Sequence, residues 1–360
     1  MDTKFKITKN ENSKISEVDF DNIPFGKIFS DHMFTADYKD GEWGNFQIVP
    51  FGPIQIHPAC LALHYGQSIF EGMKATKSYS GDPLLFRPEM HATRINASAR
   101  RMAMPEFPED VFVEAIHAIV GLDQKWIPPA EGSALYIRPF MFANGEYIGV
   151  GPSDTYKFVI FTGPVGPYYP KPIGLVAEEF YVRAAVGGTG EAKACGNYAG
   201  SLLPTELAKQ KGYDQVLWLD GKEYKYVQEA GTMNLFFVID DVVITPATDG
   251  AILKGITRDS LLAILDSFGY KIEVRPITID EIVKASKNGL LQEAFGAGTA
   301  VVVANIDRIK YKDNVLKLPV PEKQKVANFL RNEINGIRSQ KKADEFDWIV
   351  PVKAPEAIKA

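Results

Sequence analysis

The chain has 360 residues, of which 46% are hydrophobic and 24% charged; such values are typical of soluble globular proteins, and the length fits about two domains. A net charge of -5 argues against nucleic acid or an anionic membrane surface as a partner. The only cysteines, Cys60 and Cys195, are too few for a disulfide framework. No run approaches the ~18 apolar residues of a membrane span, and the first residues lack the apolar core of a signal peptide. We therefore expect a cytoplasmic protein whose partners are small molecules.

The first half of the chain predicts a small domain. Residues 1–24 carry little pattern and are expected to form an N-terminal extension. Apolar residues at Ile95, Ala99 and Met102 predict a helix over 91–104, which Pro105 ends, and a second helix is predicted over 110–120. Strands are predicted over 134–142 and 157–163. We assign 25–163 to a small α/β domain and the proline-rich segment 164–174 to a linker, because prolines interrupt helices and central strands.

The second half predicts a larger domain over 175–360. Its expected elements are strand-like 173–186, a loop over 187–200, a helix over 202–211, strands over 214–219, 231–239 and 242–246, a helix from Thr257, a strand over 272–279, a helix from Asp280, strand-like segments over 293–295 and 300–306, and a helix over 322–338. Helices and strands are mixed in both halves, which indicates an α/β or α+β fold in two domains.

The glycine-rich loop GGTGEAKACGNYAG contains the most informative lysine. No Gly-Lys-Ser/Thr closes a phosphate loop there, and Gly188-x-Gly190 lacks the third glycine of a dinucleotide fingerprint. Taken alone, Lys193 among small residues is typical of a solvated lysine, since a reactive amine needs desolvation or a neighbouring positive charge. The rest of the chain must decide between these interpretations.

Nine segments, which lie between Phe25 and Ala300, carry a family resemblance: FGKIFSDHMF, LHYGQSIFEGMKA, LFRPEMHATRI, LYIRPF, KACGNY, QVLWLDG, EAGTMNLFF, LKGITRDSLL and FGAGTA. In this order they resemble the branched-chain amino acid aminotransferases, pyridoxal 5'-phosphate enzymes of fold type IV (the D-amino-acid-aminotransferase-like fold). The resemblance implies a smaller N-terminal α/β domain and a larger C-terminal pseudo-barrel domain that binds the cofactor.

The resemblance also assigns roles around the cofactor. It implies that Lys193 forms a Schiff base with pyridoxal 5'-phosphate and then moves the proton between the substrate Cα and the cofactor. Glu229 is implied to keep the pyridine nitrogen protonated, and Tyr198 to donate to the phenolic oxygen of the ring. Arg94 and the helix start at Thr257 are implied to bind the phosphate, because a helix N-terminus favours an anion. The remaining implied cofactor contacts are Leu253, Ile256 and Thr299.

For the substrate, the resemblance implies an aromatic wall that accepts branched apolar side chains. That wall consists of Tyr65, Phe70, Tyr136 and Tyr168. Arg138 is implied to bind the distal carboxylate of glutamate, and the other implied substrate contacts are Thr232, Thr299 and Ala300. The expected reaction moves the amino group between L-leucine, L-isoleucine or L-valine and 2-oxoglutarate in a homodimer. The five histidines show no metal-ligand spacing, so no metal is expected.

Two alternatives stay open at this point. The first keeps the fold and changes the reaction, giving a D-amino-acid aminotransferase or an aminodeoxychorismate lyase; Tyr136-x-Arg138 together with the segment from Thr232 to Asn234 argues against both. The second is a catalytically silent protein that binds pyridoxal phosphate. The presence of Lys193 and Glu229 argues against that alternative.

Overall fold

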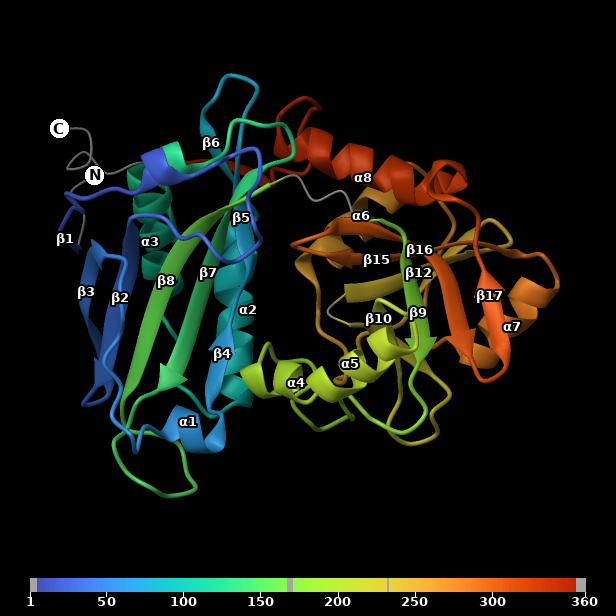
Figure 1. Cartoon of the computed structure of the whole chain (residues 1–360), viewed down its shortest axis with the longest axis horizontal. Helices are drawn as coiled ribbons and strands as arrows, with labels where there is room; N and C mark the ends of the chain where they lie inside the picture. The colour runs from blue at the N-terminus through green and yellow to red at the C-terminus, as the bar shows by residue number, and fades with distance from the viewer. Residues whose placement is uncertain (1–4, 167–170, 232, 354–360) are drawn as a thin grey trace. The chain divides into compact units, whose positions relative to one another are not determined.

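The computed structural model describes residues 5–166, 171–231 and 233–353 (Figure 1). The chain divides into two compact units. The first contains Met1–Tyr168, Ala192–Cys195 and Asn335–Ala360, and the second contains Tyr169–Glu191 and Gly196–Ile334. Four residues around Lys193 and the C-terminal segment therefore belong with the first unit, although they are reached through the second.

The first unit is a mixed sheet covered by helices. Its strands follow the order β1-β3-β2-β8-β7-β5-β6-β18, and β4 also pairs with β7. The strands are β1 (Lys6–Ile7), β2 (His32–Lys39), β3 (Glu42–Pro50), β4 (Ser68–Phe70), β5 (Met73–Lys77), β6 (Pro83–Phe86), β7 (Ala134–Ala143), β8 (Tyr156–Val165) and β18 (Ile349–Pro351). The helices are α1 (Leu61–Tyr65), α2 (Pro88–Arg101) and α3 (Glu109–Leu122), with short 3-10 turns at Ile15–Glu17 and Gln124–Trp126.

Helices α2 and α3 lie against one face of this sheet (Figure 1). Fully buried Ile95 on α2 and Phe112 on α3 belong to one core with Phe34, Ile69 and Phe158 from the strands. Both helices match the predicted ones, although α2 ends at Arg101 rather than Met104. The reason is local: Ala103 has a φ of +51°, which no right-handed helix accommodates.

The second unit is built on a closed sheet. Its strands follow the order β11-β10-β9-β16-β15-β12-β13-β14, with β17 on β16. The strands are β9 (Ile173–Ala177), β10 (Gln215–Leu219), β11 (Val227–Ala230), β12 (Met233–Ile239), β13 (Val242–Thr245), β14 (Ile272–Val274), β15 (Leu291–Gly298), β16 (Val302–Tyr311) and β17 (Asn314–Lys317). The remaining helices are α4 (Cys195–Ala199), α5 (Leu202–Gln210), α6 (Ile256–Ser267), α7 (Ile279–Lys287) and α8 (Lys325–Arg338), with a 3-10 turn at Pro321–Lys323.

Strand β11 closes this sheet, because it pairs with β10 on one side and with β12 on the other. Buried Leu175, Leu217, Leu235 and Ile306, from four strands of the ring, share one apolar core. The barrel-like arrangement confirms the predicted α/β class with a pseudo-barrel. In the described part of the chain, no helix combines the length and apolar character needed to cross a membrane.

Several predicted elements are shorter than expected. The strand predicted over 272–279 ends at Val274, before Pro276, which cannot donate to a strand pairing. Two further differences have a visible local cause. The strand predicted over 173–186 ends at Ala177, since the Glu178 carboxylate accepts hydrogen bonds from the main-chain N–H groups of Phe180 and Tyr181 and turns the chain. The helix predicted over 322–338 begins at Lys325, after the 3-10 turn that contains Pro321. Both differences arise where a local turn competes with a longer regular element.

Candidate functional site

The predicted site residues fall into two groups, one in each unit. Lys193, Arg94, Phe70, Tyr136 and Arg138 lie in the first unit, together with Tyr65 at the end of α1, whose side chain is 42% exposed. The second unit holds Tyr198, Glu229, Leu253, Ile256, Thr257, Thr299 and Ala300. Tyr168 and Thr232 lie outside the described residues.

Lys193 is held firmly in the first unit. Its main-chain N–H donates to the Oγ of Ser98 on α2 at 2.9 Å, and its carbonyl accepts from the N–H of Phe70 at 3.1 Å. The next residue, Ala194, forms a β-bridge with Ile69. The Lys193 Nζ lies 4.9 Å from the centre of the Phe70 ring. The lysine is therefore half-buried, fixed at its backbone and directed over an aromatic face, unlike a solvated loop lysine.

Arg94, one turn before Ser98 on α2, is anchored by a buried carboxylate. Its Nε and Nη2 donate to the two oxygens of Glu71 at 2.7 and 2.8 Å, and the Nδ1 of His91 lies 2.7 Å from the Glu71 Oε2. Burial raises the pKa of fully buried Glu71, but the charge of Arg94 and the hydrogen bonds from Arg94 and His91 outweigh it and hold that pKa well below its usual range. The Glu71 carboxylate is therefore charged and fixes the plane of the Arg94 guanidinium.

Burial also acts on His91, lowering its pKa against the opposing attraction of Glu71. The imidazole is consequently neutral near pH 7, and its Nδ1 position beside a carboxylate identifies Nδ1–H as the donor. The charge of Arg94 thus faces the Glu71 carboxylate, and the neighbouring imidazole adds no second positive charge beside it.

Phe70, Tyr136 and Arg138 form the second part of this group. Tyr136 and Arg138 are two residues apart on β7 and therefore point to the same face of the sheet. The Arg138 Nη2 donates to the Tyr136 hydroxyl at 3.0 Å, and the Arg138 Cζ lies 4.7 Å from the centre of the Phe70 ring. Among the described residues, the buried Arg138 Nε has no hydrogen-bond partner. An orphaned N–H beside an aromatic wall suits an incoming carboxylate.

Glycine is required beside this pair. A Cβ added to Gly72 would overlap the Tyr136 hydroxyl, so the FEGMKA segment leaves the space that the tyrosine occupies. Gly72 directly follows Glu71. Glu71 holds Arg94 and Gly72 leaves room for Tyr136, so these two neighbours contribute to both parts of the first unit's group.

Glu229 is the centre of the second group. It lies on β11 opposite Asn234 on β12 and is 4% exposed. Its Oε1 accepts from the Asn234 Nδ2 at 3.0 Å and from the N–H of Leu253 at 2.9 Å, and its Oε2 lies 2.9 Å from the Arg183 Nη2. Three donors around a buried carboxylate favour its charged form, which is the form that pairs with a protonated pyridine nitrogen. The structure brings Glu229 and Leu253 together through the hydrogen bond from the Leu253 N–H.

The start of α6 offers main-chain donors. Helix α6 begins at Ile256, and its N-cap, Gly255, provides no side-chain hydrogen bond. A Cβ at Gly255 would overlap the Asn234 Oδ1, which explains the glycine. Ile256 and Thr257 are almost fully buried at 5% and 3% exposure. Such a helix start fits a phosphate group, because its first N–H groups have no partner within the helix.

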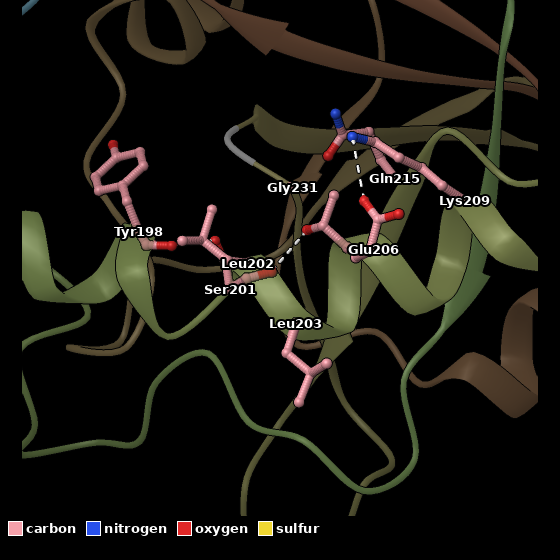
Figure 2. A pocket seen from close by; sticks show the side chains of 9 residues that line it. Tyr198, Ser201, Leu202, Leu203, Glu206, Lys209, Gln215 and Gly231 are labelled. Carbon is pink, nitrogen blue, oxygen red and sulfur yellow. Dashed lines mark hydrogen bonds and ion pairs between the residues drawn. The ribbon is translucent and has the colours of Figure 1, made fainter.

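Tyr198 and the glycine before Thr232 line one pocket of the second unit (Figure 2). Its volume is about 560 Å³. Its walls consist of Tyr198, Ser201, Leu202, Leu203, Thr205, Glu206, Lys209, Gln215 and Gly231. Gly231 has a φ of +53°, and a Cβ there would overlap the Gln215 side chain. Thr299 and Ala300 lie half-buried in the turn between β15 and β16.

Several residues at these positions were missed by the sequence reasoning. Glu71 stands in the quoted segment FEGMKA, and Ser98 follows Arg94 by one helical turn, so both had a local signal. Asn234 likewise stands in the quoted segment EAGTMNLFF. Arg183 carries no such signal, because its contact with Glu229 depends on segments that meet only in the fold.

Comparisons with known proteins agree with this geometry. The model of the family "Amino-transferase class IV" matches residues 68–309. The chain is similar to branched-chain-amino-acid aminotransferase 2 of Bacillus subtilis (strain 168), with 44% identity over 346 residues and 95% of each chain covered. It is also similar to a solved T.th. branched-chain amino acid aminotransferase, with 27% identity and a TM-score of 0.71, covering 88% of this chain and 98% of that one. That enzyme was solved in complex with N-(5'-phosphopyridoxyl)-L-glutamate and with 4-methylvaleric acid. The chain therefore belongs to the class IV aminotransferases, in the branch whose curated members are branched-chain-amino-acid aminotransferases.

Proposed function

We propose that the protein transfers the amino group between L-leucine, L-isoleucine or L-valine and 2-oxoglutarate, using pyridoxal 5'-phosphate. The observation that carries this proposal is the position of one ring: the Lys193 Nζ and the Arg138 Cζ lie 4.9 and 4.7 Å from the centre of Phe70. An apolar wall thus adjoins both an amine and a guanidinium. A hydrocarbon side chain and a carboxylate side chain are both accommodated by such surroundings.

When bound, the cofactor supplies the electron sink that stabilises negative charge at the substrate Cα. Lys193 would hold the cofactor and, through its Nζ, carry the proton to and from that carbon. Glu229 would face the pyridine nitrogen, and Tyr198 the phenolic oxygen. Leu253 would contact the ring, and the phosphate would be bound by Arg94, Ile256, Thr257 and Thr299. These roles fit three observations: Glu229 lies among hydrogen-bond donors, Arg94 is anchored by Glu71, and the start of α6 has no side-chain cap.

The substrate would meet two kinds of surface. Tyr65, Phe70, Tyr136 and Tyr168 would form the wall for a branched side chain, and Arg138 would bind the distal carboxylate of 2-oxoglutarate or glutamate. Thr232, Thr299 and Ala300 would bind the carboxylate at Cα. Support comes from the T.th. enzyme, whose structures hold both an aliphatic acid and a glutamate adduct.

We further propose that the protein works in the cytoplasm as a homodimer. Tyr65 is 42% exposed within one chain, which leaves an aromatic residue of the proposed substrate wall open to a second copy. Light scattering coupled to size-exclusion chromatography tests the dimer: a mass near 80 kDa, twice the 39.9 kDa chain, is expected, and a monomeric mass in the active protein contradicts it.

The role of Lys193 is tested by Lys193→Ala, with Lys222→Ala, an exposed turn lysine, as the matched control. Loss of general acid–base catalysis alone lowers a rate by about 10²–10⁴-fold, so we expect at least that loss for Lys193→Ala with L-leucine and 2-oxoglutarate. Circular dichroism should show the same fold in both variants. If Lys193→Ala keeps more than a tenth of the wild-type kcat, the assignment is wrong.

A further inference from the structure

A single buried hydroxyl joins Lys193 to the helix that carries Arg94. The Ser98 Oγ accepts from the Lys193 N–H at 2.9 Å and donates to the Arg94 carbonyl at 3.1 Å. Ser98 is 1% exposed. A serine that donates to the carbonyl four residues earlier is common within helices. The bond from the Lys193 N–H to the Ser98 hydroxyl is different, because it joins positions 95 residues apart in the sequence.

The opposite side of the Lys193 peptide is held by main chain. The Phe70 N–H donates to the Lys193 carbonyl, and Ala194 bridges Ile69. Of the three contacts just described, that of Ser98 is made by a side chain and the other two by main chain. It is therefore the contact that a substitution can remove without altering a strand.

Arg94, at the other end of the serine bond, is itself immobilised. Two of its nitrogens bind the fully buried Glu71, at 2.7 and 2.8 Å. Glu71 thus holds the Arg94 side chain, and the Ser98 hydroxyl links the Arg94 main-chain carbonyl to the Lys193 N–H. Because Glu71 and Ser98 are fully buried, both contacts lie in closely packed surroundings that leave them little freedom to shift.

We propose that Ser98 is a positioning residue of the aminotransferase reaction, which sets the place of the Lys193 Cα relative to Arg94. The inference rests on the proposed roles of Lys193 as the amine and Arg94 as a phosphate ligand. If those roles hold, Ser98 fixes the separation between the point where the cofactor is linked and the point where its phosphate is held. Catalytic groups displaced by about 1 Å lose up to a hundredfold in rate.

Three variants test this role: Ser98→Ala removes the hydroxyl, Ser98→Thr keeps it, and Ser30→Ala is the matched control. Ser30 is a serine of the same unit, 3% exposed, whose hydroxyl pairs with the Thr162 hydroxyl outside the proposed site. Each holoenzyme is measured for kcat and KM with L-leucine, for the pH titration of the bound cofactor's absorption, and for its melting temperature.

For Ser98→Ala we expect kcat to fall about tenfold, within the range for a misplaced catalytic group, while KM changes less than twofold and the midpoint of the spectral titration shifts. Ser30→Ala should lower the melting temperature similarly but keep the wild-type kcat and titration. Ser98→Thr should restore most of the kcat.

A Ser98→Ala enzyme that matches Ser30→Ala in kcat and titration overturns the inference. So does a Ser98→Thr enzyme with the wild-type melting temperature and the low kcat of Ser98→Ala. Failure of the proposed function looks different, because the wild-type protein itself would then show no turnover of L-leucine or no bound cofactor.

Discussion

At the scale of single residues, two buried carboxylates define the two groups of candidate site residues. Glu71 fixes the guanidinium of Arg94. Glu229 accepts hydrogen bonds from the Asn234 side chain and the Leu253 N–H and forms an ion pair with Arg183. The pKa of Glu71 is held well below its usual range, and Glu229 lies against three donors. If Arg94 binds the phosphate and Glu229 faces the pyridine nitrogen, as proposed, both side chains are already held in place before the ligand binds, and little reorganisation is left for the binding step.

Arg138 provides the residue-scale prediction about specificity. Arg138→Ala should lower kcat/KM for glutamate about 10- to 100-fold, since a hydrogen bond to a charged group contributes about 1.5–3 kcal/mol. With L-leucine, whose side chain presents no carboxylate, the loss should be several times smaller. Steady-state kinetics with both donors measures the difference. Equal losses would indicate that Arg138 supports the Tyr136 hydroxyl and not the substrate.

The sequence singled out Lys193, Glu229 and Arg94 through the family resemblance, because each stands in a segment that the resemblance covers. Arg183 was not singled out, since its Nη2 meets Glu229 across 46 positions of sequence and only the closed sheet brings them together. The assigned roles themselves stay predictions until the variants are measured.

At the scale of elements, helix boundaries follow capping chemistry that the sequence only partly displays. Helix α7 begins at Ile279, one residue before the predicted start, because Thr278 is its N-cap and the Thr278 Oγ1 accepts from the Glu281 N–H at 3.0 Å. Thr278 and Glu281 stand at the spacing of a capping box. Reading that spacing would have given the correct first residue.

Removal of this cap gives the element-scale prediction. Thr278→Ala should reduce the free energy of unfolding by about 1 kcal/mol, the usual cost of losing an N-cap hydroxyl. Thr278→Ser retains an acceptor and should lose less than half as much. Chemical denaturation measures both. A Thr278→Ala protein as stable as the wild type would show that the contact with Glu281 contributes nothing net.

At the scale of the whole molecule, the first unit is assembled from three stretches of chain. Its C-terminal stretch adds β18 to β6 and places Arg338 over the Phe86 ring, with the Arg338 Cζ 4.3 Å from the ring centre. The Thr76 hydroxyl donates to the Arg338 carbonyl at 2.9 Å. Sequence patterns predicted contiguous domains and could not anticipate this return, because the pairing partners are more than 250 residues apart.

Lys74, on β5 of the same unit, makes the global stability depend on pH. Burial, with a contribution from the charge of Arg338, lowers the pKa of Lys74 to about 7. In the unfolded chain Lys74 titrates near pH 10.4, so between pH 7 and 10 the unfolded state binds more protons than the folded state. Stability should therefore rise with pH across this window, by at most about 1.4 kcal/mol per pH unit from this group.

Lys74→Met tests this dependence, with Lys77→Met on the same strand as the control for the substitution itself. The variant should remove the rise in unfolding free energy that Lys74 contributes between pH 7 and 10, and it should be more stable than the wild type at pH 7. Urea denaturation at four pH values measures the slope. An unchanged slope in Lys74→Met contradicts the assignment.

The central claim is that this fold binds pyridoxal 5'-phosphate and uses it to exchange amino groups between branched-chain amino acids and 2-oxoglutarate. It is tested most directly by the visible absorption spectrum of the purified, cofactor-loaded protein, recorded before and after L-leucine and then after 2-oxoglutarate, with D-alanine as the parallel donor. The long-wavelength band of the bound cofactor should disappear with L-leucine, return with 2-oxoglutarate, and persist with D-alanine. A band that persists with L-leucine and disappears with D-alanine would contradict the claim.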